Sequence, residues 1–285
     1  MKNLKIRTKD AAYQKLEVLS TNRNKRYRYF EFLIEGVRNI NEAVKNGWEF
    51  SSLIFSPETQ LSDWAKNTLK TVKTDFNIEL SAPLMAELSE KEDTSELMAV
   101  VKMRPDDTAE IKIRNVPLIA LFDRPSNKGN LGTILRTLDS LGADGLIITG
   151  HGVDPYDREV VGATMGSFFS VPFVRVPKHS DLLAYMDQLR ETYGDLQVIG
   201  TTAHAEKSLW QADLTKPTIF MIGCETDGLS EGLRQYCTDM VTIPMAENCA
   251  ATSFNVACAT TVMFYEAVRQ RSGSPDWHGS AFGQS

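Results

Sequence analysis

Three short segments of this 285-residue chain combine glycine with polar side chains that could bind and position a ligand. In the first, residues 123–132, two glycines follow a polar run, and Arg136 lies about one helical turn further on. Glycine allows tight turns, a helix start offers free N–H groups, and a guanidinium can hold an anion. The glycine spacing matches neither a dinucleotide loop nor a phosphate loop. Taken alone, this segment is best explained as an ordinary turn between a strand and a helix, with a surface arginine.

The second segment, residues 222–229, places Glu225 between Gly223 and Gly228 directly after an apolar run. Such a turn makes a tight polar wall in which a carboxylate could bind a hydroxyl or an amine group. A carboxylate is also favourable beside any helix N-terminus, so Glu225 has a purely structural explanation as well.

The third segment, residues 243–256, begins with an apolar run that Pro244 ends, and mostly small residues follow. Ser253 is a good N-cap for the helix that comes next. A capping role explains Ser253 well but Asn255 less well, because asparagine is a poor residue inside a helix. Both short polar side chains are therefore candidates for orienting a ligand.

The elements that carry these segments alternate between strand and helix from residue 116 onward. Six apolar runs are predicted strands: Leu118–Phe122, Gly145–Ile148, Val171–Val174, Gln197–Gly200, Ile219–Ile222 and Val241–Ile243. Near-continuous apolar strands separated by helices indicate an α/β fold with a mostly parallel sheet covered on both faces. Ligands bind beyond the carboxyl ends of the strands in such sheets, where the three segments lie. A last helix, from about residue 253 to 269, is apolar on several sides and should be buried or lie at a subunit interface.

Residues 30–103 show a second, smaller α/β pattern. Apolar residues at helical spacing predict a helix that stops at Gly47; they are Leu33, Val37, Ile40 and Val44. Strands are predicted at 53–55 and 97–101, with a helix capped by Asp63 between them. The polar, proline-containing stretch 104–108 marks a domain boundary. We therefore divide the chain into an N-terminal arm with a small domain (1–108), a larger domain (109–271) and a flexible tail (272–285).

The charge of the chain is unevenly distributed. The net charge is −6, yet residues 1–28 hold nine basic and two acidic side chains, which gives this end +7. A basic end on an acidic body suits local docking of a phosphate backbone. Arg23, Lys25, Arg26 and Arg28 are interleaved with aromatic residues, which fits phosphate contact and base stacking on an exposed RNA loop. A solvated tail, or aromatic residues that begin a core, would explain the same pattern.

The composition favours an ordinary globular protein. Hydrophobic residues make up 42% and charged residues 24% of the chain, and no apolar run reaches the roughly 18 residues of a membrane helix. The N-terminus is charged and lacks the apolar segment that a signal peptide contains, so we expect a cytoplasmic protein. The four cysteines form no C-x-x-C pair and the four histidines are scattered, which favours reduced structural thiols over a metal site.

Taken together, the three segments resemble the three motifs of the SpoU (TrmH) family of RNA 2′-O-ribose methyltransferases, in the SPOUT superfamily. The matching elements are N-x-G-x-x-x-R at 130–136, G-x-E-x-x-G-L at 223–229, and I-P-M with S-x-N-V within 243–256. The resemblance covers nearly all of residues 116–269. Residues 20–103 look like the small, ribosomal-protein-like substrate-binding domain of that family, and residues 32–38 are similar to its opening.

The resemblance implies a C-terminal trefoil knot, a rare exception to unknotted topology, with the three segments gathered around S-adenosyl-L-methionine (AdoMet). It also implies an RNA substrate, no metal, and a homodimer with the active site near the subunit interface. The residues that match the family's AdoMet contacts are Thr201, Gly223, Ile243 and Phe254. The residues that match its catalytic and substrate-positioning set are Asn130, Arg136, Glu225, Ser253 and Asn255.

The reaction that the resemblance implies is in-line attack of a ribose 2′-hydroxyl on the methyl group, in which positioning should dominate catalysis. Arg136 is the family's candidate for the hydroxyl proton, although its high pKa makes orientation of the hydroxyl and its phosphate the better-founded role. The sequence departs from the family at Phe254, where leucine is usual, at Ala257, often serine, and at Gly162, where arginine is common.

Two other functions remain as alternatives. A non-catalytic RNA-binding paralogue would keep the fold, but the presence of Asn130, Arg136, Glu225 and Asn255 argues against it. A nucleotide-dependent oxidoreductase would use a similar sheet, but the glycine fingerprint is missing. Ribosomal and transfer RNA are both compatible with the motifs.

Overall fold

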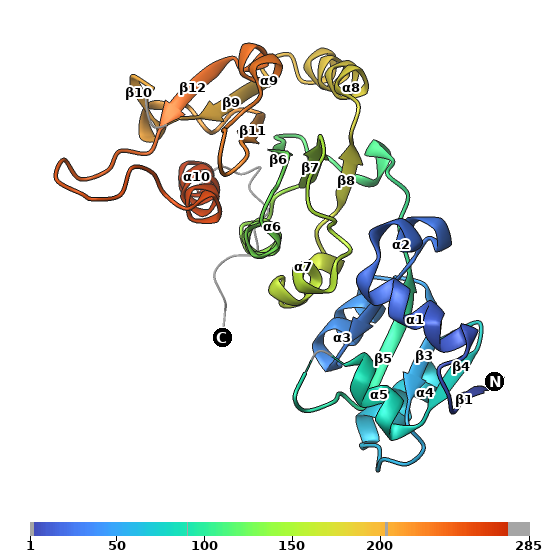
Figure 1. Ribbon diagram of the computed structural model, residues 1–285. Helices are drawn as coiled ribbons and strands as arrows, with labels where there is room; N and C mark the ends of the chain where they lie inside the picture. Colours follow the sequence, from blue (N-terminus) through green and yellow to red (C-terminus); the bar gives the residue numbers. More distant parts are fainter. Residues whose placement is uncertain (1–2, 90, 203–204, 273–285) are drawn as a thin grey trace. The chain divides into compact units, whose positions relative to one another are not determined.

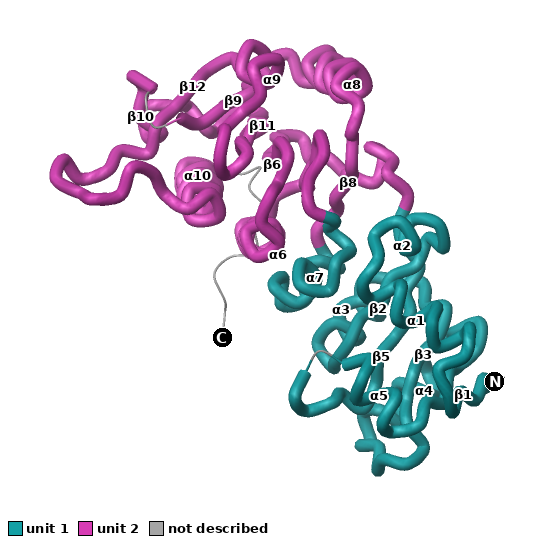
Figure 2. The backbone as a smooth tube through the Cα atoms, viewed as in Figure 1, with its two compact units in different colours: residues 1–104, 154–170 teal, residues 105–153, 171–285 magenta. Residues whose placement is uncertain are grey.

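The computed structural model describes residues 3–89, 91–202 and 205–272 of the chain (Figure 1). The chain forms two compact units (Figure 2): unit 1 comprises residues 1–104 and 154–170, and unit 2 comprises residues 105–153 and 171–285. The chain passes from one unit to the other at the boundary predicted from residues 104–108. It then returns to unit 1 for residues 154–170, which the sequence pattern had placed in the larger domain. Apart from Ser272, the tail expected to be flexible lies outside the described residues.

Unit 1 is built on a mixed five-stranded sheet with the order β1-β4-β3-β5-β2. Its strands are β1 (Asn3–Ile6), β2 (Glu31–Glu35), β3 (Phe50–Phe55), β4 (Asn77–Leu80) and β5 (Leu97–Lys102). Strands β1, β4 and β3 are parallel, whereas β5 runs antiparallel to β3 and to β2. The predicted strands at 53–55 and 97–101 are therefore present. Leu33, which was predicted to begin a helix, lies in β2 instead.

Seven helical segments accompany this sheet: α1 (Ala11–Thr21), α2 (Arg23–Tyr29), α3 (Val37–Lys45), α4 (Asp63–Thr71), α5 (Ala82–Leu88), α7 (Arg158–Ala163) and the 3₁₀ turn η2 (Ser167–Phe169). Local capping sets several of their starts. The side chain of Asp10 accepts hydrogen bonds from the first turn of α1, and that of Asn22 does so for α2. Ser62, rather than the predicted Asp63, caps α4. The basic N-terminal residues 3–28 are thus folded elements and not a solvated tail.

Residues 154–170 are fastened into unit 1 by apolar and ionic contacts. Rings from this segment join an aromatic cluster whose members are Phe32, Trp48, Tyr156, Phe168 and Phe169. The buried guanidinium of Arg158 donates to Glu35 Oε2 at 2.9 Å, and that of Arg26 donates to Asp154 Oδ2 at 2.8 Å. Burying a charge is costly unless it is paired, so these pairs specify where the segment lies.

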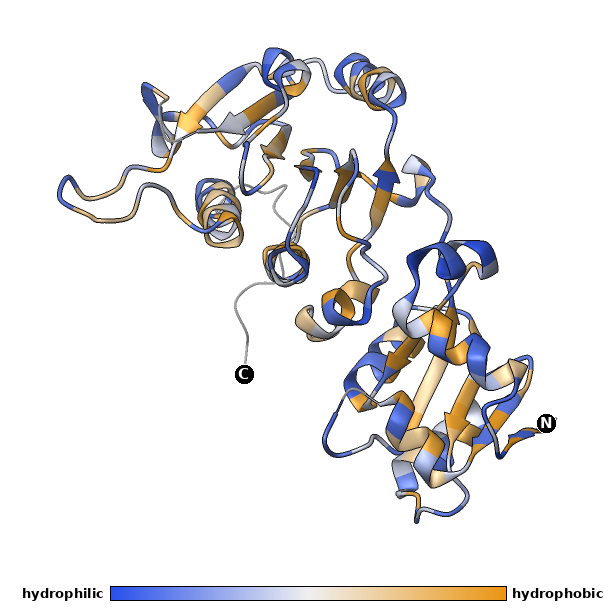
Figure 3. Ribbon diagram, viewed as in Figure 1, coloured by the Kyte–Doolittle hydropathy of each residue, from blue (hydrophilic) through white to orange (hydrophobic). Residues whose placement is uncertain are grey.

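Unit 2 contains a seven-stranded sheet with the order β10-β12-β9-β11-β6-β7-β8, and every pairing in it is parallel. The strands are β6 (Leu118–Asp123), β7 (Gly145–Thr149), β8 (Phe173–Val176), β9 (Gln197–Thr201), β10 (Lys207–Ser208), β11 (Thr218–Ile222) and β12 (Asp239–Thr242). Each of the six predicted strands is therefore present, within a few residues at its ends. Figure 3 shows β6, β7 and β11 as hydrophobic strands, as expected for the centre of a parallel sheet.

The helical segments of unit 2 are α6 (Lys128–Ser140), α8 (His179–Thr192), α9 (Glu231–Tyr236), α10 (Val256–Arg271), and the 3₁₀ turns η1 (Thr108–Glu110) and η3 (Leu209–Gln211). Helix α10 packs against α6, where the hydroxyl oxygens of Thr137 and Thr261 lie 2.8 Å apart. One face of α10 is buried around Met263 and Phe264, but Val262 and Tyr265 on the opposite side are exposed. None of the described helices is both long and apolar enough to span a bilayer.

Candidate active site at the carboxyl edge of the parallel sheet

The order of the strands in unit 2 creates a switch point between β6 and β11. From β6 the chain continues to β7 and β8 on one side, while β9 and β12 lie on the other side of β11. The loops that leave the carboxyl ends of β6 and β11 therefore lie at this switch point, and such a position is where open α/β sheets bind ligands. Two of the three segments singled out from the sequence are these two loops, at 123–132 and 222–229.

Glu225 joins these two loops. Its Oε2 accepts hydrogen bonds from the Ser126 hydroxyl at 2.6 Å and the Ser126 backbone N–H at 3.0 Å. Its Oε1 accepts from the Asn127 backbone N–H at 3.2 Å and from Asn130 Nδ2 at 3.2 Å. Four hydrogen bonds from one short stretch fix the carboxylate in place. Glu225 is therefore positioned to organise the site rather than left free to bind a ligand.

Asn130 connects this pair of loops to the third segment. While its Nδ2 donates to Glu225, its Oδ1 accepts from Asn255 Nδ2 at 3.1 Å. The Asn255 Oδ1 in turn accepts from the backbone N–H groups of Ala257 at 2.9 Å and Cys258 at 3.3 Å. In each amide both the oxygen and the nitrogen are hydrogen-bonded, so the direction of both side chains is determined. Three segments distant in sequence are linked by one chain of hydrogen bonds.

The start of α10 differs from the prediction. Asn255, not Ser253, is the N-cap of the helix, which begins at Val256. Asparagine and serine are equally good N-caps, and the two positions are only two residues apart. The poor fit of asparagine inside a helix is thereby explained, because Asn255 is not inside one. Ser253 is exposed in the loop before the cap, where it faces the cavity described below.

The glycines of the second segment are required by close backbone approach. A Cβ atom on Gly223 would lie 2.4 Å from the carbonyl carbon of Gly228, and Gly228 has a φ of +68°. Between them, the backbone groups of Cys224 and Gly228 exchange two hydrogen bonds of 3.1 and 2.9 Å. This closed turn presents Glu225 at its tip towards the loop after β6. The glycine spacing thus reflects the shape of the turn.

Asp123 and Arg124, at the end of β6, hold the same turn from its other side. Arg124 has a left-handed φ of 51°, which is uncommon for a residue with a side chain. Its guanidinium donates to both carboxylate oxygens of the buried Asp123 at 3.1 Å and to the Gly228 carbonyl at 3.1 Å. Asp123 Oδ2 also accepts from the Ser230 backbone N–H at 2.8 Å. The roles of Asp123, Arg124 and the N-cap Asn127 were not predicted from the sequence. Asn127 could have been found, because its spacing of three residues to Asn130 is a capping signal.

A cavity of about 700 Å³ opens beside these loops, which is within the range of roughly 300–1,000 Å³ for small-molecule sites. All four residues predicted to contact the cofactor line it, namely Thr201, Gly223, Ile243 and Phe254. Four of the five residues predicted for catalysis and positioning also line it: Asn130, Glu225, Ser253 and Asn255. The cavity therefore brings together residues from β9, from the loop after β11, and from both ends of the loop between β12 and α10.

Arg136 is the exception, because it does not line the cavity. It lies on α6 six residues after Asn130, which places it about 9 Å further along the axis and about 120° around it. Its side chain is exposed, and among the described residues no hydrogen bond or ion pair engages its guanidinium. Arg136 is therefore free to contact a molecule that approaches from outside the chain.

The hydrogen bonds at Glu225 also set its charge state. Burial alone raises the pKa of Glu225, but the Ser126 hydroxyl, the backbone N–H groups and Asn130 outweigh it, so its pKa lies below the usual value. Glu225 is therefore ionised at neutral pH. A carboxylate with a lowered pKa stabilises the fold above its unfolded pKa, and this contribution is lost as the pH falls through the folded value.

The predicted RNA-contacting residues lie together on α2, with one correction. Arg23 and Arg28 are exposed and Lys25 is half-buried, whereas Arg26 is only 1% exposed. The guanidinium of Arg26 donates to Asp154 and to the carbonyls of Leu19 and Ser20. A phosphate cannot reach it there, so its role is structural. Gly162, at the position where the family commonly has arginine, is exposed on α7 with open space around it.

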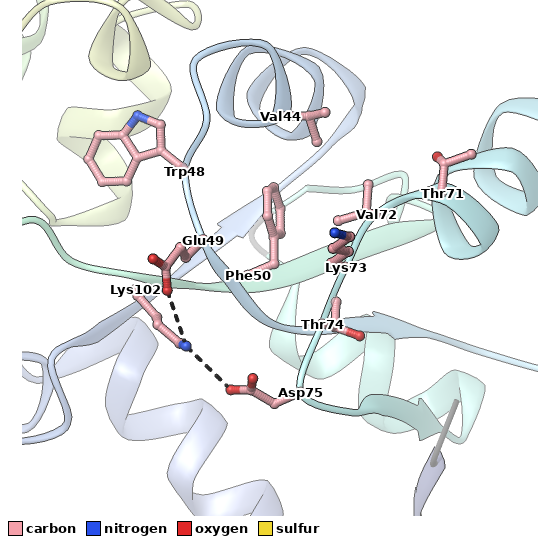
Figure 4. A pocket seen from close by; sticks show the side chains of 10 residues that line it. All are labelled: Val44, Trp48, Glu49, Phe50, Thr71, Val72, Lys73, Thr74, Asp75 and Lys102. Carbon is pink, nitrogen blue, oxygen red and sulfur yellow. Dashed lines mark hydrogen bonds and ion pairs between the residues drawn. The ribbon is translucent and has the colours of Figure 1, made fainter.

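A second, shallower cavity of about 560 Å³ lies in unit 1, between the start of β3, the loop before β4, and the end of β5 (Figure 4). Lys102 Nζ there forms ion pairs with Glu49 at 3.3 Å and Asp75 at 3.6 Å. None of the predicted site residues lines this cavity. The described residues also contain no cluster of three or more side chains suited to hold a metal ion.

Comparison with known proteins agrees with this arrangement. The profile of the SpoU rRNA Methylase family matches residues 117–265, and that of the SpoU L30e-like domain matches residues 10–99. A 23S rRNA (uridine(2479)-2′-O)-methyltransferase from Streptomyces viridochromogenes is 42% identical over 268 residues, covering 94% of this chain and 92% of that protein.

Solved structures show the same relationship. The crystal structure of the SpoU methyltransferase AviRb from Streptomyces viridochromogenes, in complex with AdoMet, has a TM-score of 0.87 and 43% identity, covering 92% of this chain and 98% of that one. An AdoMet-bound rRNA methyltransferase from Sinorhizobium meliloti has a TM-score of 0.80 and 25% identity, covering 94% and 98%. By its two matching profiles and by relatives that span almost its whole length, the chain belongs to the SpoU rRNA methylase family.

Proposed function

We propose that this protein transfers the methyl group of AdoMet to the 2′-hydroxyl of a ribose in ribosomal RNA. The proposal rests on the cavity at the carboxyl edge of the parallel sheet, which gathers eight of the nine residues matched to the family's cofactor and catalytic sets. The relative from Streptomyces viridochromogenes, named for 23S rRNA, makes this RNA the first substrate to test. Since ribosomal RNA is handled inside the cell, we place the protein in the cytoplasm.

The cavity suits AdoMet in chemistry and size. Its wall combines an exposed aromatic ring and aliphatic groups from Phe254, Ile243 and Met245 with the backbone of the turn at Gly223. AdoMet would supply an already activated methyl group, so the protein needs to contribute binding and orientation above all. The chain Glu225–Asn130–Asn255 fixes the loops that would hold the cofactor and leaves Ser253 exposed towards the ribose.

Arg136 would act from the substrate side. A guanidinium is protonated at any physiological pH, so it can donate two parallel hydrogen bonds to a phosphate and its neighbouring hydroxyl. Its exposure on α6, away from the cavity wall, fits contact with RNA rather than with the cofactor. In this role Arg136 orients the 2′-hydroxyl and stabilises negative charge as the proton leaves to water.

Unit 1 would bind the RNA through α2. Lys25 and Arg28 make no recorded ion pair among the described residues, while Arg23 lies over the Tyr27 ring at 5.7 Å. By contrast, other basic groups of the N-terminal residues are already paired with carboxylates, such as Lys9 with Glu87 and Lys15 with Glu31. The charge available for phosphate is therefore concentrated at Lys25 and Arg28.

We also propose the trefoil knot and the homodimer that the family resemblance implies. In support of the first, the chain passes from β12, near one side of the sheet, through a long loop and returns to pack α10 against α6 (Figure 1). In support of the second, α10 exposes an apolar face in the single chain, where Val262 is 39% and Tyr265 is 55% exposed. Large exposed apolar side chains in a row on a helix are typical of an interface.

A charge on this face should prevent dimer formation. We expect Tyr265→Glu to sediment as a monomer, because an unpaired carboxylate would be buried against the partner. Analytical ultracentrifugation of wild type and variant measures this. Val44→Glu, an exposed apolar position in unit 1, is the matched control and should sediment like wild type. A Tyr265→Glu protein with the wild-type sedimentation coefficient would show that α10 is not the interface.

Cofactor binding should protect one cysteine from alkylation. Cys224 lines the cavity; burial raises the pKa of its thiol, but hydrogen bonds from Thr226 and the neighbouring backbone outweigh it and leave the pKa below its usual value. Burial raises the pKa of Cys237 to about 11, so Cys237 should react far more slowly at pH 8. Peptide mass spectrometry after iodoacetamide treatment should show that AdoMet slows modification of Cys224. Equal rates at Cys224 with and without AdoMet would place the cofactor elsewhere.

Calorimetric titration tests the cofactor part of the proposal directly. AdoMet and S-adenosylhomocysteine should each bind once per chain, and NAD should not bind. Binding of NAD instead would favour an oxidoreductase. A protein that binds RNA, but binds neither AdoMet nor S-adenosylhomocysteine even when RNA is present, would be better explained as a non-catalytic RNA-binding paralogue.

A further inference from the structure

Helix α2 ends at a residue whose backbone is under strain. Phe30, the C-cap, has φ 58° and ψ 36°, the left-handed conformation. This region normally holds glycine or asparagine at helix ends, and a bulky side chain there is a genuine outlier. Such strain persists where the surrounding structure or a function maintains it. The question is therefore what an aromatic side chain contributes at this position.

Nearly half of the surface of Phe30 is exposed to solvent. Phe30 is 44% exposed, whereas Phe32, two positions later, is fully buried in the aromatic cluster of unit 1. No ring or cation contact to Phe30 is recorded within the described ranges, although its carbonyl accepts from the Met103 N–H at 2.9 Å. The fold thus uses the backbone of Phe30 and leaves its side chain at the surface.

Basic residues lie close to Phe30 in the sequence. Arg28 is two residues away and exposed, Lys25 lies one turn earlier, and Lys15 Nζ sits 5.0 Å from the centroid of the neighbouring Tyr29 ring. The adjacent acidic residue, Glu31, is paired with Lys15 at 2.7 Å and accepts from Ser51 at 2.5 Å, so its charge is compensated. Lys25 and Arg28 form no ion pair with another described residue. An exposed aromatic ring that follows such cations in the chain is a combination that binds single-stranded nucleic acid.

We propose that Phe30 stacks on an unpaired base of the RNA substrate, while Arg28 and Lys25 contact the phosphates on either side of that base. This inference rests on the proposed function and extends it by assigning a specific base-stacking residue in unit 1. Phe30 is exposed at the cap of α2, and one face of Tyr29 is already covered by Lys15. Phe30 is therefore the ring that offers a free face to a base.

A glycine at this position should relieve the backbone strain and remove the ring at the same time. The effect on RNA binding can therefore be separated from an effect on stability. We expect Phe30→Gly to unfold at the wild-type temperature or above it, since glycine adopts the left-handed conformation without a steric penalty. The same variant should bind unmodified 23S rRNA transcript about ten-fold more weakly, because the loss of one base–aromatic stacking interaction has an effect of this size. Its affinity for AdoMet and its rate at saturating RNA should not change. Phe30→Trp should keep the affinity for RNA, as should the control Val44→Ala, an apolar position of similar exposure in the same unit.

Photo-crosslinking adds a readout that does not depend on a variant. A 23S rRNA transcript that carries 5-iodouridine should crosslink to the tryptic peptide 29–38, which begins after Arg28 and contains Phe30. Crosslinks confined to other peptides, or a Phe30→Gly affinity for RNA within two-fold of wild type, would overturn the inference. If wild type methylates this RNA in those experiments, the proposed function stands and only the role of Phe30 fails. If wild type neither binds nor methylates RNA, the proposed function itself fails.

Discussion

Arg136→Ala should lower the rate of RNA methylation about 100-fold to 1,000-fold and leave the affinity for AdoMet unchanged. Loss of a single donor that stabilises developing charge typically has an effect of this size. The affinity should not change because Arg136 lies outside the cavity that holds the cofactor contacts. Single-turnover methylation of 23S rRNA at saturating RNA, together with calorimetry of AdoMet, measures both quantities.

The conservative variant Arg136→Lys separates charge from geometry. Lysine keeps the positive charge but cannot donate two parallel hydrogen bonds, so we expect it to recover only a small part of the rate. Full recovery would mean that Arg136 serves only as a distant positive charge. An Arg136→Ala enzyme with the wild-type rate would contradict the assignment of Arg136 to the substrate side of the reaction.

Arg26→Met should destabilise the protein by about 3–5 kcal/mol, the range found when one partner of a buried ion pair is removed. Asp154 would be left buried, at 5% exposure, and the donors that remain to it among the described residues are the Tyr27 hydroxyl at 2.7 Å and the Tyr156 N–H at 3.1 Å. Denaturant unfolding followed by circular dichroism measures the change in free energy.

Arg28→Met is the matched control for this prediction, because it removes the same charge two residues away at an exposed position. Its effect on stability should be within about 0.5 kcal/mol of zero, while its affinity for RNA should fall. The double variant Arg26→Met with Asp154→Leu should regain part of the lost stability, because no charge is then left buried. If Arg26→Met is as stable as Arg28→Met but binds RNA more weakly, then Arg26 is a phosphate contact after all.

The strands and loops of unit 2 could be predicted from the sequence because they are encoded locally. A central parallel strand is apolar along its whole length, and the glycines of residues 222–229 are dictated by a turn in which Gly223 meets Gly228. The start of α10 was misplaced because Ser253 and Asn255 satisfy the same capping rule. The local sequence does not show which of the two takes the helix N–H groups.

The N-terminal region was predicted less well for a physical reason. Leu33, Val37, Ile40 and Val44 have helical spacing, but Gly36, at φ +91°, divides them between β2 and α3. Arg26 looks like any other residue of a basic run, and its partner Asp154 is 128 residues away. The same holds for the Asn130–Asn255 amide pair, 125 residues apart. Contacts of this kind form only when the tertiary structure brings distant residues together, so they cannot be predicted from sequence periodicity.

Alkaline hydrolysis of the labelled product tests most directly whether the methyl group goes to a ribose hydroxyl of RNA. Unmodified 23S rRNA is incubated with the protein and AdoMet tritiated in the methyl group, and the RNA is then hydrolysed in alkali. Alkali cleaves RNA through the free 2′-hydroxyl, so a 2′-O-methylated nucleotide stays joined to its neighbour. We predict that the label appears in an alkali-resistant dinucleotide. Label in mononucleotides would mean that a base is methylated, and absence of label from this RNA and from transfer RNA would contradict the methyltransferase function.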